Sequence, residues 1–318
     1  MNKILGLLIA ILIISCSKEN KLEQEIAKIE VHVRIDRFDE VFNNSSTKDL
    51  PKLKNKYPYL FPAEYNDSIW ANRMNDTLQK ELYAEIDKRF ADFENDTAQF
   101  SSLFQHIKYY FTDFKPPKIV TVISDVDYKN RVIYADTLLL LGLDNYLGAD
   151  HKFYKGIQQY IRKNFEASQI PVDMAKTIAK SKVRPPESRT FIAQMVYYGK
   201  IYYLVHLFLP NTAKEVQLGY TGEELKWAIA NEGYIWRYFV ERELLFSTDA
   251  KLQERFIHPA PFSKFYLELD NESPGRLGQY IGWQIVNAYM ENNEVSLQHM
   301  LNASAEEIFN NSKYKPKK

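Results

Sequence analysis

A histidine within a long apolar helix is the side chain whose chemistry can be tested most directly. His206 lies in the run from Phe191 to Pro210, which is nearly all apolar and aromatic. A hydrolytic zinc site on a helix needs two histidines one turn apart and a glutamate that activates the bound water. One turn before His206 the chain has Tyr202, and Tyr203 occupies the glutamate position. No two of the six histidines are one turn apart, so the spacing does not predict such a site.

Other catalytic arrangements are also missing from the sequence. There is no Gly-x-Ser-x-Gly motif for a nucleophilic serine, and the single cysteine is Cys16. Asp125, Asp127 and Asp144 could offer oxygen ligands to a cation, but their spacing is better explained by polar turns. The formal net charge of +0 argues against nucleic acid as a partner. We therefore expect no catalytic residue, no metal and no cofactor.

The N-terminus has the composition of an export signal. Residues 1–15 combine an early lysine with an apolar run that is too short to span a bilayer comfortably. The sequence Ile13-Ile14-Ser15-Cys16 resembles the lipobox of bacterial lipoproteins, in which the cysteine carries fatty acids such as palmitate. We predict a signal peptide over residues 1–15, a lipidated Cys16, and a polar tether over residues 16–28. The domain would face the periplasm, and the choice between inner and outer membrane stays open.

The rest of the chain predicts one α+β domain over residues 29–312, predominantly helical with a small sheet in its first half. Alternating apolar side chains predict a strand over residues 29–38, and apolar runs predict strands over 118–124 and 131–141 that could form a hairpin. Helical spacing predicts helices over residues 68–93, 98–111, 152–164, 172–181, 191–210, 223–246, 273–291 and 296–310. Residues 313–318 form a basic tail that we expect to be mobile.

Three helix starts carry recognisable signals. Ser188 could cap the central helix, because its hydroxyl can accept a hydrogen bond from a free backbone amide. Thr221 with Glu224 matches a capping box. Ser273 followed by Pro274 predicts a cap and a proline in the first turn.

Charged residues among aromatic side chains indicate a possible recognition surface in the C-terminal half. A polar network beside rings can organise a core or bind a partner. The candidate residues are Trp227, Trp236, Lys264, Asp270, Arg276 and Trp283. A second candidate is the basic cluster Lys176, Lys180, Lys182, Arg184 and Arg189, which could contact phosphates or lipid headgroups, although a solvated surface explains it better.

Several of these stretches resemble one known family. The runs MVYYGKIYYLVHLFLP, LKWAIANEGYIW and APFSKFYLELDNESPGRLGQYIGWQIV, together with the lipobox, are similar to the gliding-motility lipoprotein GldB family of Bacteroidota. That family resembles, more distantly, predicted zinc proteases of the zincin type. The resemblance implies a zincin-like fold whose metal motif is degenerate. Tyr202 and Tyr203 then replace histidine and glutamate, while His206 and Glu232 keep ligand positions.

The resemblance also implies a function in gliding motility and in the associated protein secretion machinery. We expect a membrane-anchored, non-enzymatic lipoprotein that binds other envelope proteins. One alternative is an active zinc-dependent hydrolase with a rearranged metal site that uses His206 and Glu232. Another is a module that binds envelope lipids or glycans.

Overall fold

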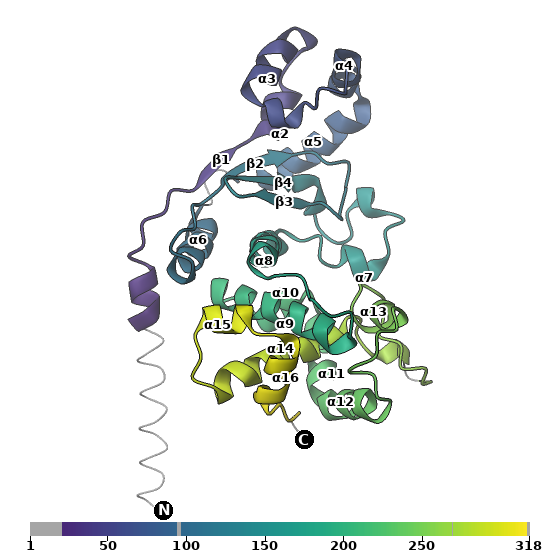
Figure 1. Ribbon diagram of the computed structural model, residues 1–318. Helices are drawn as coiled ribbons and strands as arrows, with labels where there is room; N and C mark the ends of the chain where they lie inside the picture. The colour runs from purple at the N-terminus through teal and green to yellow at the C-terminus, as the bar shows by residue number, and fades with distance from the viewer. Residues whose placement is uncertain (1–20, 94–96, 269, 317–318) are drawn as a thin grey trace, which may run out of the picture.

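A small mixed sheet lies between a group of N-terminal helices and a larger helical body in the computed structural model (Figure 1). The structure describes residues 21–93, 97–268 and 270–316. The predicted signal peptide and Cys16 lie outside these residues. None of the helices in the described ranges has the length and apolar character that crossing a membrane requires. The predicted α+β class, predominantly helical, is confirmed.

The sheet has the strand order β1-β2-β4-β3. Its strands are β1 (Arg34–Asp36), β2 (Lys118–Val122), β3 (Val132–Ala135) and β4 (Leu138–Gly142). β1 and β4 both run parallel to β2, while β3 is antiparallel to β4. The expected hairpin between residues 118–124 and 131–141 is therefore wrong. Asp136 has a left-handed φ of 51° and turns the chain, so the single strand expected over 131–141 is itself the hairpin β3–β4.

The N-terminal helices cover one face of this sheet with their own small core. The helices that build this core are α2 (Phe38–Asn43), α3 (Leu50–Lys56) and α4 (Asp67–Asn75). The next two helices, α5 (Thr77–Phe90) and α6 (Ala98–Tyr110), instead bury Phe90 and Leu103 in the larger core on the opposite face of the sheet. Phe38, Leu53 and Tyr57 pack with Val120 of β2. The single helix expected over residues 68–93 is divided at Asp76. The carboxylate of Asp76 accepts a hydrogen bond from the amide of Gln79, so it caps α5 rather than continuing α4.

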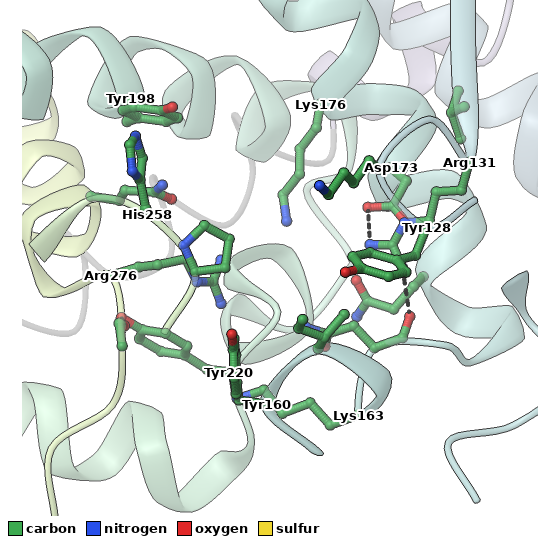
Figure 2. A pocket seen from close by; sticks show the side chains of 18 of the residues that line it. Tyr128, Arg131, Tyr160, Lys163, Asp173, Lys176, Tyr198, Tyr220, His258 and Arg276 are labelled. Carbon is green, nitrogen blue, oxygen red and sulfur yellow. Dashed lines mark hydrogen bonds and ion pairs between the residues drawn. The ribbon is translucent and has the colours of Figure 1, made fainter. Parts of the chain in front are cut away.

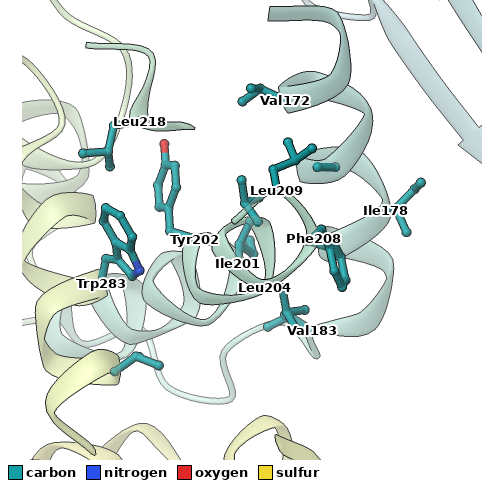
Figure 3. Packing of buried hydrophobic residues seen from close by; sticks show 14 of the residues in the cluster. Val172, Ile178, Val183, Ile201, Tyr202, Leu204, Phe208, Leu209, Leu218 and Trp283 are labelled. Atoms are coloured by element: carbon teal, nitrogen blue, oxygen red, sulfur yellow. The ribbon is translucent and has the colours of Figure 1, made fainter. Parts of the chain in front are cut away.

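The helical body holds most of the hydrophobic core. Its helices are α7 (Gln159–Arg162), α8 (Ile170–Lys182), α9 (Phe191–Phe208), α10 (Lys214–Leu218), α11 (Gly222–Ala230), α12 (Glu232–Glu241), α13 (Lys251–Phe256), α14 (Leu277–Asn292), α15 (Leu297–Asn302) and α16 (Ala305–Ser312). The predicted central helix is confirmed as α9, which is buried on most sides. Figure 3 shows Ile201 and Leu204 of α9 between α8 and Trp283 of α14.

Two glycines allow α9 and α14 to pack with their backbones in contact. A Cβ atom on Gly199 would lie 2.2 Å from the carbonyl oxygen of Gly282. A Cβ on Gly282 would lie 1.9 Å from the carbonyl oxygen of Met195, one turn before Gly199. Only a residue without a side chain fits at either position, so both glycines serve the close packing of the two helices.

Only some of the sequence signals for helix starts correctly predicted where a helix begins. The capping box of Thr221 and Glu224 is present at the start of α11. The helix expected over residues 223–246 instead breaks at Asn231 into α11 and α12. Thr190, not Ser188, is the N-terminal cap residue of α9. α14 begins at Leu277 after Arg276, because Ser273 is used to bind the 263–270 loop.

Both ends of the described chain are attached to the body. Residues 21–26, expected to be part of the tether, are helical, and Ile26 is buried. The carboxylate of Glu23 contacts the ring of His106 on α6 at 3.2 Å. At the other end, the ring of Tyr314 packs on Trp236 with 5.1 Å between centroids. The mobile tail expected from residue 313 is therefore wrong at Tyr314, because the aromatic ring there packs on half-buried Trp236.

Candidate functional site

His206 lies on α9 in a hydrogen-bonded, half-buried position. The side-chain amide of Gln217 lies 3.3 Å from Nδ1 of His206, and the imidazole ring lies 6.0 Å from the ring of Trp283. Burial lowers the pKa of His206, and the positive charge of Lys214 lowers it further. The neutral imidazole is therefore favoured at neutral pH, with one of its nitrogens already beside Gln217.

Tyr202 and Tyr203 leave α9 in different directions. The Tyr202 hydroxyl donates a hydrogen bond of 2.9 Å to Oε1 of Gln279 and accepts one of 3.2 Å from Arg276. Its ring lies 6.2 Å from Trp283, so Tyr202 and His206 share the helix face toward α14, as residues one turn apart should. Tyr203 is partly buried, and burial raises its pKa, with Glu291 adding to the effect.

Glu232 is a buried carboxylate whose two oxygens are both occupied. Oε2 accepts a hydrogen bond of 2.7 Å from the hydroxyl of Tyr280, and Oε1 accepts one of 2.8 Å from the hydroxyl of Tyr314. Burial and the Glu232 carboxylate both raise the pKa values of these two tyrosines, which keeps the phenols protonated as donors. Among the residues that the structure describes, no three His, Cys, Asp or Glu side chains are grouped so that they could hold a metal ion.

The predicted recognition residues do not form one surface. Trp283 is wrong as a surface residue, because it is 1% exposed and packs in the α9–α14 core. Trp236 is half-buried against Phe309 and Tyr314, and Trp227 packs against the same core.

The charged members of that set are separated as well. Lys264 is exposed, and Asp270 accepts hydrogen bonds from the amides of Phe265 and Tyr266 at 3.1 and 2.7 Å. Arg276 alone faces a cavity. The six residues predicted as one recognition surface are therefore distributed over the hydrophobic core, a loop and the wall of a cavity.

That cavity has a volume of about 780 Å³ and lies where α8, α9 and the start of α14 meet the loops around residues 128–132 and 258–260 (Figure 2). Its walls carry Tyr128, Tyr160, Tyr198, Tyr202 and Tyr220. In Figure 2, Lys176 and Arg276 extend toward the centre of the cavity from different sides. The size is in the range of small-molecule sites in proteins.

The basic cluster expected over residues 176–189 is divided by the helix. Lys176 and Lys180, one turn apart on α8, line the cavity. Lys182 lies over the ring of Phe111 at 5.4 Å instead, and Arg184 and Arg189 are exposed elsewhere. Further cations in the cavity wall come from segments distant in the sequence and include Arg131 before β3 and Lys163 after α7. No local sequence pattern could associate these two residues with α8.

Lys176 is the most perturbed cation of the cavity. Its side chain reaches cavity solvent but is enclosed by protein, and burial lowers its pKa to about 7. Asp173 opposes this effect, whereas Arg276, Arg131 and Lys180 add to it. The nearest ring is Tyr202, whose centroid is 5.3 Å from the ammonium nitrogen.

The fold and the cavity define a helix-rich α+β protein with a small-molecule-sized cavity beside its central helix. The chain belongs to the family of the gliding motility protein GldB, whose model matches residues 19–316. It is therefore a gliding motility lipoprotein, and the predicted family is confirmed. Comparison with curated proteins and with solved structures returned no match.

Proposed function

We propose that this protein is a lipid-anchored component of the gliding motility and protein secretion machinery that binds other envelope proteins and catalyses no reaction. Family membership supports a place in the gliding apparatus. The anchor would be Cys16, the only cysteine, which follows the apolar run of residues 4–14. A lipid-anchored protein that catalyses no reaction acts through the contacts that its folded domain makes with other proteins.

The observation that carries the non-enzymatic proposal is the hydrogen bonding of Glu232. A glutamate that binds zinc or activates water must present a carboxylate lone pair to a site that the metal or the water can reach. Here Tyr280 and Tyr314 each donate to one oxygen, and Glu232 is only 5% exposed. Together with tyrosines at positions 202 and 203, this arrangement supports a former metallopeptidase site that is now used for packing.

A metal and activity assay tests this proposal. Protein purified without added zinc should contain no stoichiometric metal, should show no peptide cleavage, and should keep its melting temperature when a chelator is added. Glu254→Gln on exposed α13 serves as the matched control for Glu232→Gln. One tightly bound zinc and peptide cleavage, both lost in Glu232→Gln but kept in Glu254→Gln, would establish the hydrolase instead.

The contact with partners is proposed to include the loop before α14. Tyr266 and Leu267 are 73% and 62% exposed and lie next to each other. Tyr266 has a left-handed φ of 63°, and the carboxylate of Asp270 binds the amides of Phe265 and Tyr266, so the loop conformation is held from within. Arg255 lies over the Tyr266 ring at 4.4 Å, which supports the ring from one side. Exposed, ordered aromatic side chains are common anchors of protein interfaces.

Site-specific photocrosslinking in native membranes tests this contact. A crosslinker at position 266 should capture a defined envelope protein, whereas one at exposed Lys52 on α3 should not. With the crosslinker at the neighbouring exposed position 267, Tyr266→Asp should reduce both the crosslink and gliding without lowering the amount of protein. Equal capture at both positions, or normal gliding of Tyr266→Asp, would reject the loop as a partner contact. Loss of incorporated palmitate in Cys16→Ser tests the anchor separately.

A further inference from the structure

The cavity between α8, α9 and α14 has an excess of positive charge that the protein does not neutralise. Its lining includes six cationic side chains and one carboxylate, namely Lys129, Arg131, Lys163, Lys176, Lys180 and Arg276 against Asp173. A concave wall with charges of one sign concentrates its field inside the cavity. The question is which of these cations remain without a counter-ion.

Two of the six are paired within the protein. Nε of Arg131 lies 2.8 Å from Oδ2 of Asp173, whose same oxygen also accepts a hydrogen bond from Tyr146. Lys163 forms an ion pair at 2.5 Å with Glu224, the glutamate of the capping box. These pairs use Asp173 and Glu224, and the other four cations of the lining form no ion pair among the described residues.

Lys176 and Arg276 have no carboxylate within ion-pair distance among the described residues. Arg276 donates to two neutral oxygens, the Tyr202 hydroxyl at 3.2 Å and the Gly219 carbonyl at 3.0 Å. A guanidinium has five N–H donors, so further donors remain. Within the described part of the chain, the Lys176 ammonium lies over the face of the Tyr202 ring, 5.3 Å from its centroid. Enclosing such charges costs free energy that an anion in the cavity would offset.

The turn that carries Arg276 is tightly held. Arg276 has a left-handed φ of 62°, a strained conformation for a residue with a side chain. The preceding Gly275 approaches the Ala260 carbonyl so closely that a Cβ there would lie 2.3 Å from its oxygen. The Tyr220 hydroxyl donates 2.6 Å to the Gly275 carbonyl, and the Tyr220 ring lies 5.2 Å from the guanidinium. The guanidinium is thus positioned before any ligand arrives, which reduces the entropy cost of binding.

The charge and the walls indicate the ligand class. Of the four unpaired cations, Lys176 and Arg276 extend toward the centre (Figure 2), and their two charges match a phosphate monoester, which carries nearly two negative charges at neutral pH, better than a single carboxylate. Arginine offers a planar fork and lysine a point charge, a combination suited to phosphate oxygens. The rings of Tyr128, Tyr160 and Tyr198 on the walls could hold the organic part of such a molecule.

We propose that this cavity binds a small organic phosphate, with the phosphate between Lys176 and Arg276 and the carbon skeleton against the tyrosine walls. The ligand is a phosphate ester, either a soluble molecule or a lipid headgroup. This site is separate from the loop at Tyr266 proposed for protein partners, and its test does not depend on gliding.

Calorimetric titration of the purified full chain provides the test. Glucose 6-phosphate should bind and raise the melting temperature, whereas glucose should not bind and inorganic phosphate should bind more weakly. Lys176→Met should weaken the binding of glucose 6-phosphate about tenfold or more, because a charge-assisted contact is lost. Lys182→Met, which removes a lysine from the same helix outside the cavity, should leave the affinity unchanged.

Vesicles of phosphatidylcholine with and without phosphatidic acid distinguish the two sources. Binding to phosphatidic acid vesicles that Lys176→Met abolishes, without binding of the soluble ester, supports the site and assigns it to a lipid headgroup. The proposal is overturned if no phosphate probe binds, or if Lys176→Met and Arg276→Gln both bind like the wild type. Equal affinity for inorganic phosphate and glucose 6-phosphate would reject the role of the tyrosine walls.

Discussion

The hydroxyl of Tyr314 donates a hydrogen bond of 2.8 Å to the carboxylate of Glu232, 82 residues earlier in the chain. Tyr280 of α14 donates to the second oxygen of the same carboxylate at 2.7 Å. One buried acid therefore joins α12, α14 and the segment after α16. Glu232, which the resemblance placed at a metal-ligand position, and Tyr314, which was expected to lie in a mobile tail, are therefore hydrogen-bonded to each other.

Removing one of these donors should weaken the fold. Tyr314→Phe keeps the ring on Trp236 but leaves one oxygen of buried Glu232 with a donor missing, and we expect the free energy of unfolding to fall by about 1–3 kcal/mol. Urea unfolding of the purified protein measures the change in the free energy of unfolding. Tyr65→Phe, at an exposed tyrosine, is the control and should be nearly neutral. Equal stability of the two variants would mean that the Tyr314 hydrogen bond contributes nothing.

The contact of α9 with α14 should tolerate no side chain at Gly282. A Cβ there would lie 1.9 Å from the Met195 carbonyl oxygen, so Gly282→Ala must push two core helices apart, and we expect a loss of about 3 kcal/mol or more. Gly222→Ala at the start of α11 is the matched control, since a Cβ there meets nothing within 4 Å. Thermal unfolding compares the two variants. A melting temperature of Gly282→Ala equal to that of the control would contradict this packing.

The buried ion pair beside the sheet should be sensitive to the loss of one partner. Arg37 is 4% exposed and donates to both oxygens of Asp39, at 3.0 and 2.8 Å, and to the Phe90 carbonyl at 2.8 Å. Asp39→Ala removes the carboxylate that binds both nitrogens and leaves Glu40, 2.9 Å from Nη1 and partly exposed, as the remaining counter-ion, so we expect a loss of about 3 kcal/mol.

The matched control for this pair is Asp150→Ala. Asp150 contacts Arg162, but its side chain is 94% exposed, so its ion pair should contribute at most about 1 kcal/mol. Chemical unfolding of both variants measures the difference. Comparable losses in the two variants would show that burial does not decide the strength of these pairs.

Lys176 should make the stability of the domain depend on pH in a defined window. Its pKa is lowered to about 7 in the folded state from 10.5, so between these values the unfolded chain binds more protons and stability rises with pH. Below pH 7 both states carry the charge, and the cost of enclosing it is complete. In phosphate-free buffer, Lys176→Met should therefore be more stable than the wild type by on the order of 2 kcal/mol at pH 6, after allowing for solvent in the cavity.

This difference should shrink as the pH approaches 10, where the lysine is neutral in the folded state and increasingly neutral in the unfolded state. Unfolding curves at several pH values for the two proteins measure it. Lys182→Met is again the control, and its difference from the wild type should not follow this trend. A constant gap for Lys176→Met across the range would show that enclosure does not perturb this lysine.

Local sequence patterns predicted the structure correctly where the conformation of a segment depends on its own residues. The capping box of Thr221 and Glu224 and the long apolar run of α9 act within one or two helical turns, so the sequence predicted both. The pairing of β4 with β2 was missed because apolar runs indicate strands but do not select partners. That pairing depends on the turn at Asp136, which separates β3 from β4.

The sequence by itself determined the helix-rich class, the central helix and, through its resemblance, the family. Those properties follow from the periodicity and composition of neighbouring residues, which can be read directly from the sequence. Only the tertiary structure decided what Glu232, Arg276 and Lys176 do. Glu232 receives its second tyrosine from a segment 82 residues away, and Arg276 faces Lys176 across a cavity whose walls come from several helices. Contacts between distant segments form when the hydrophobic core closes, so no local spacing could have predicted them.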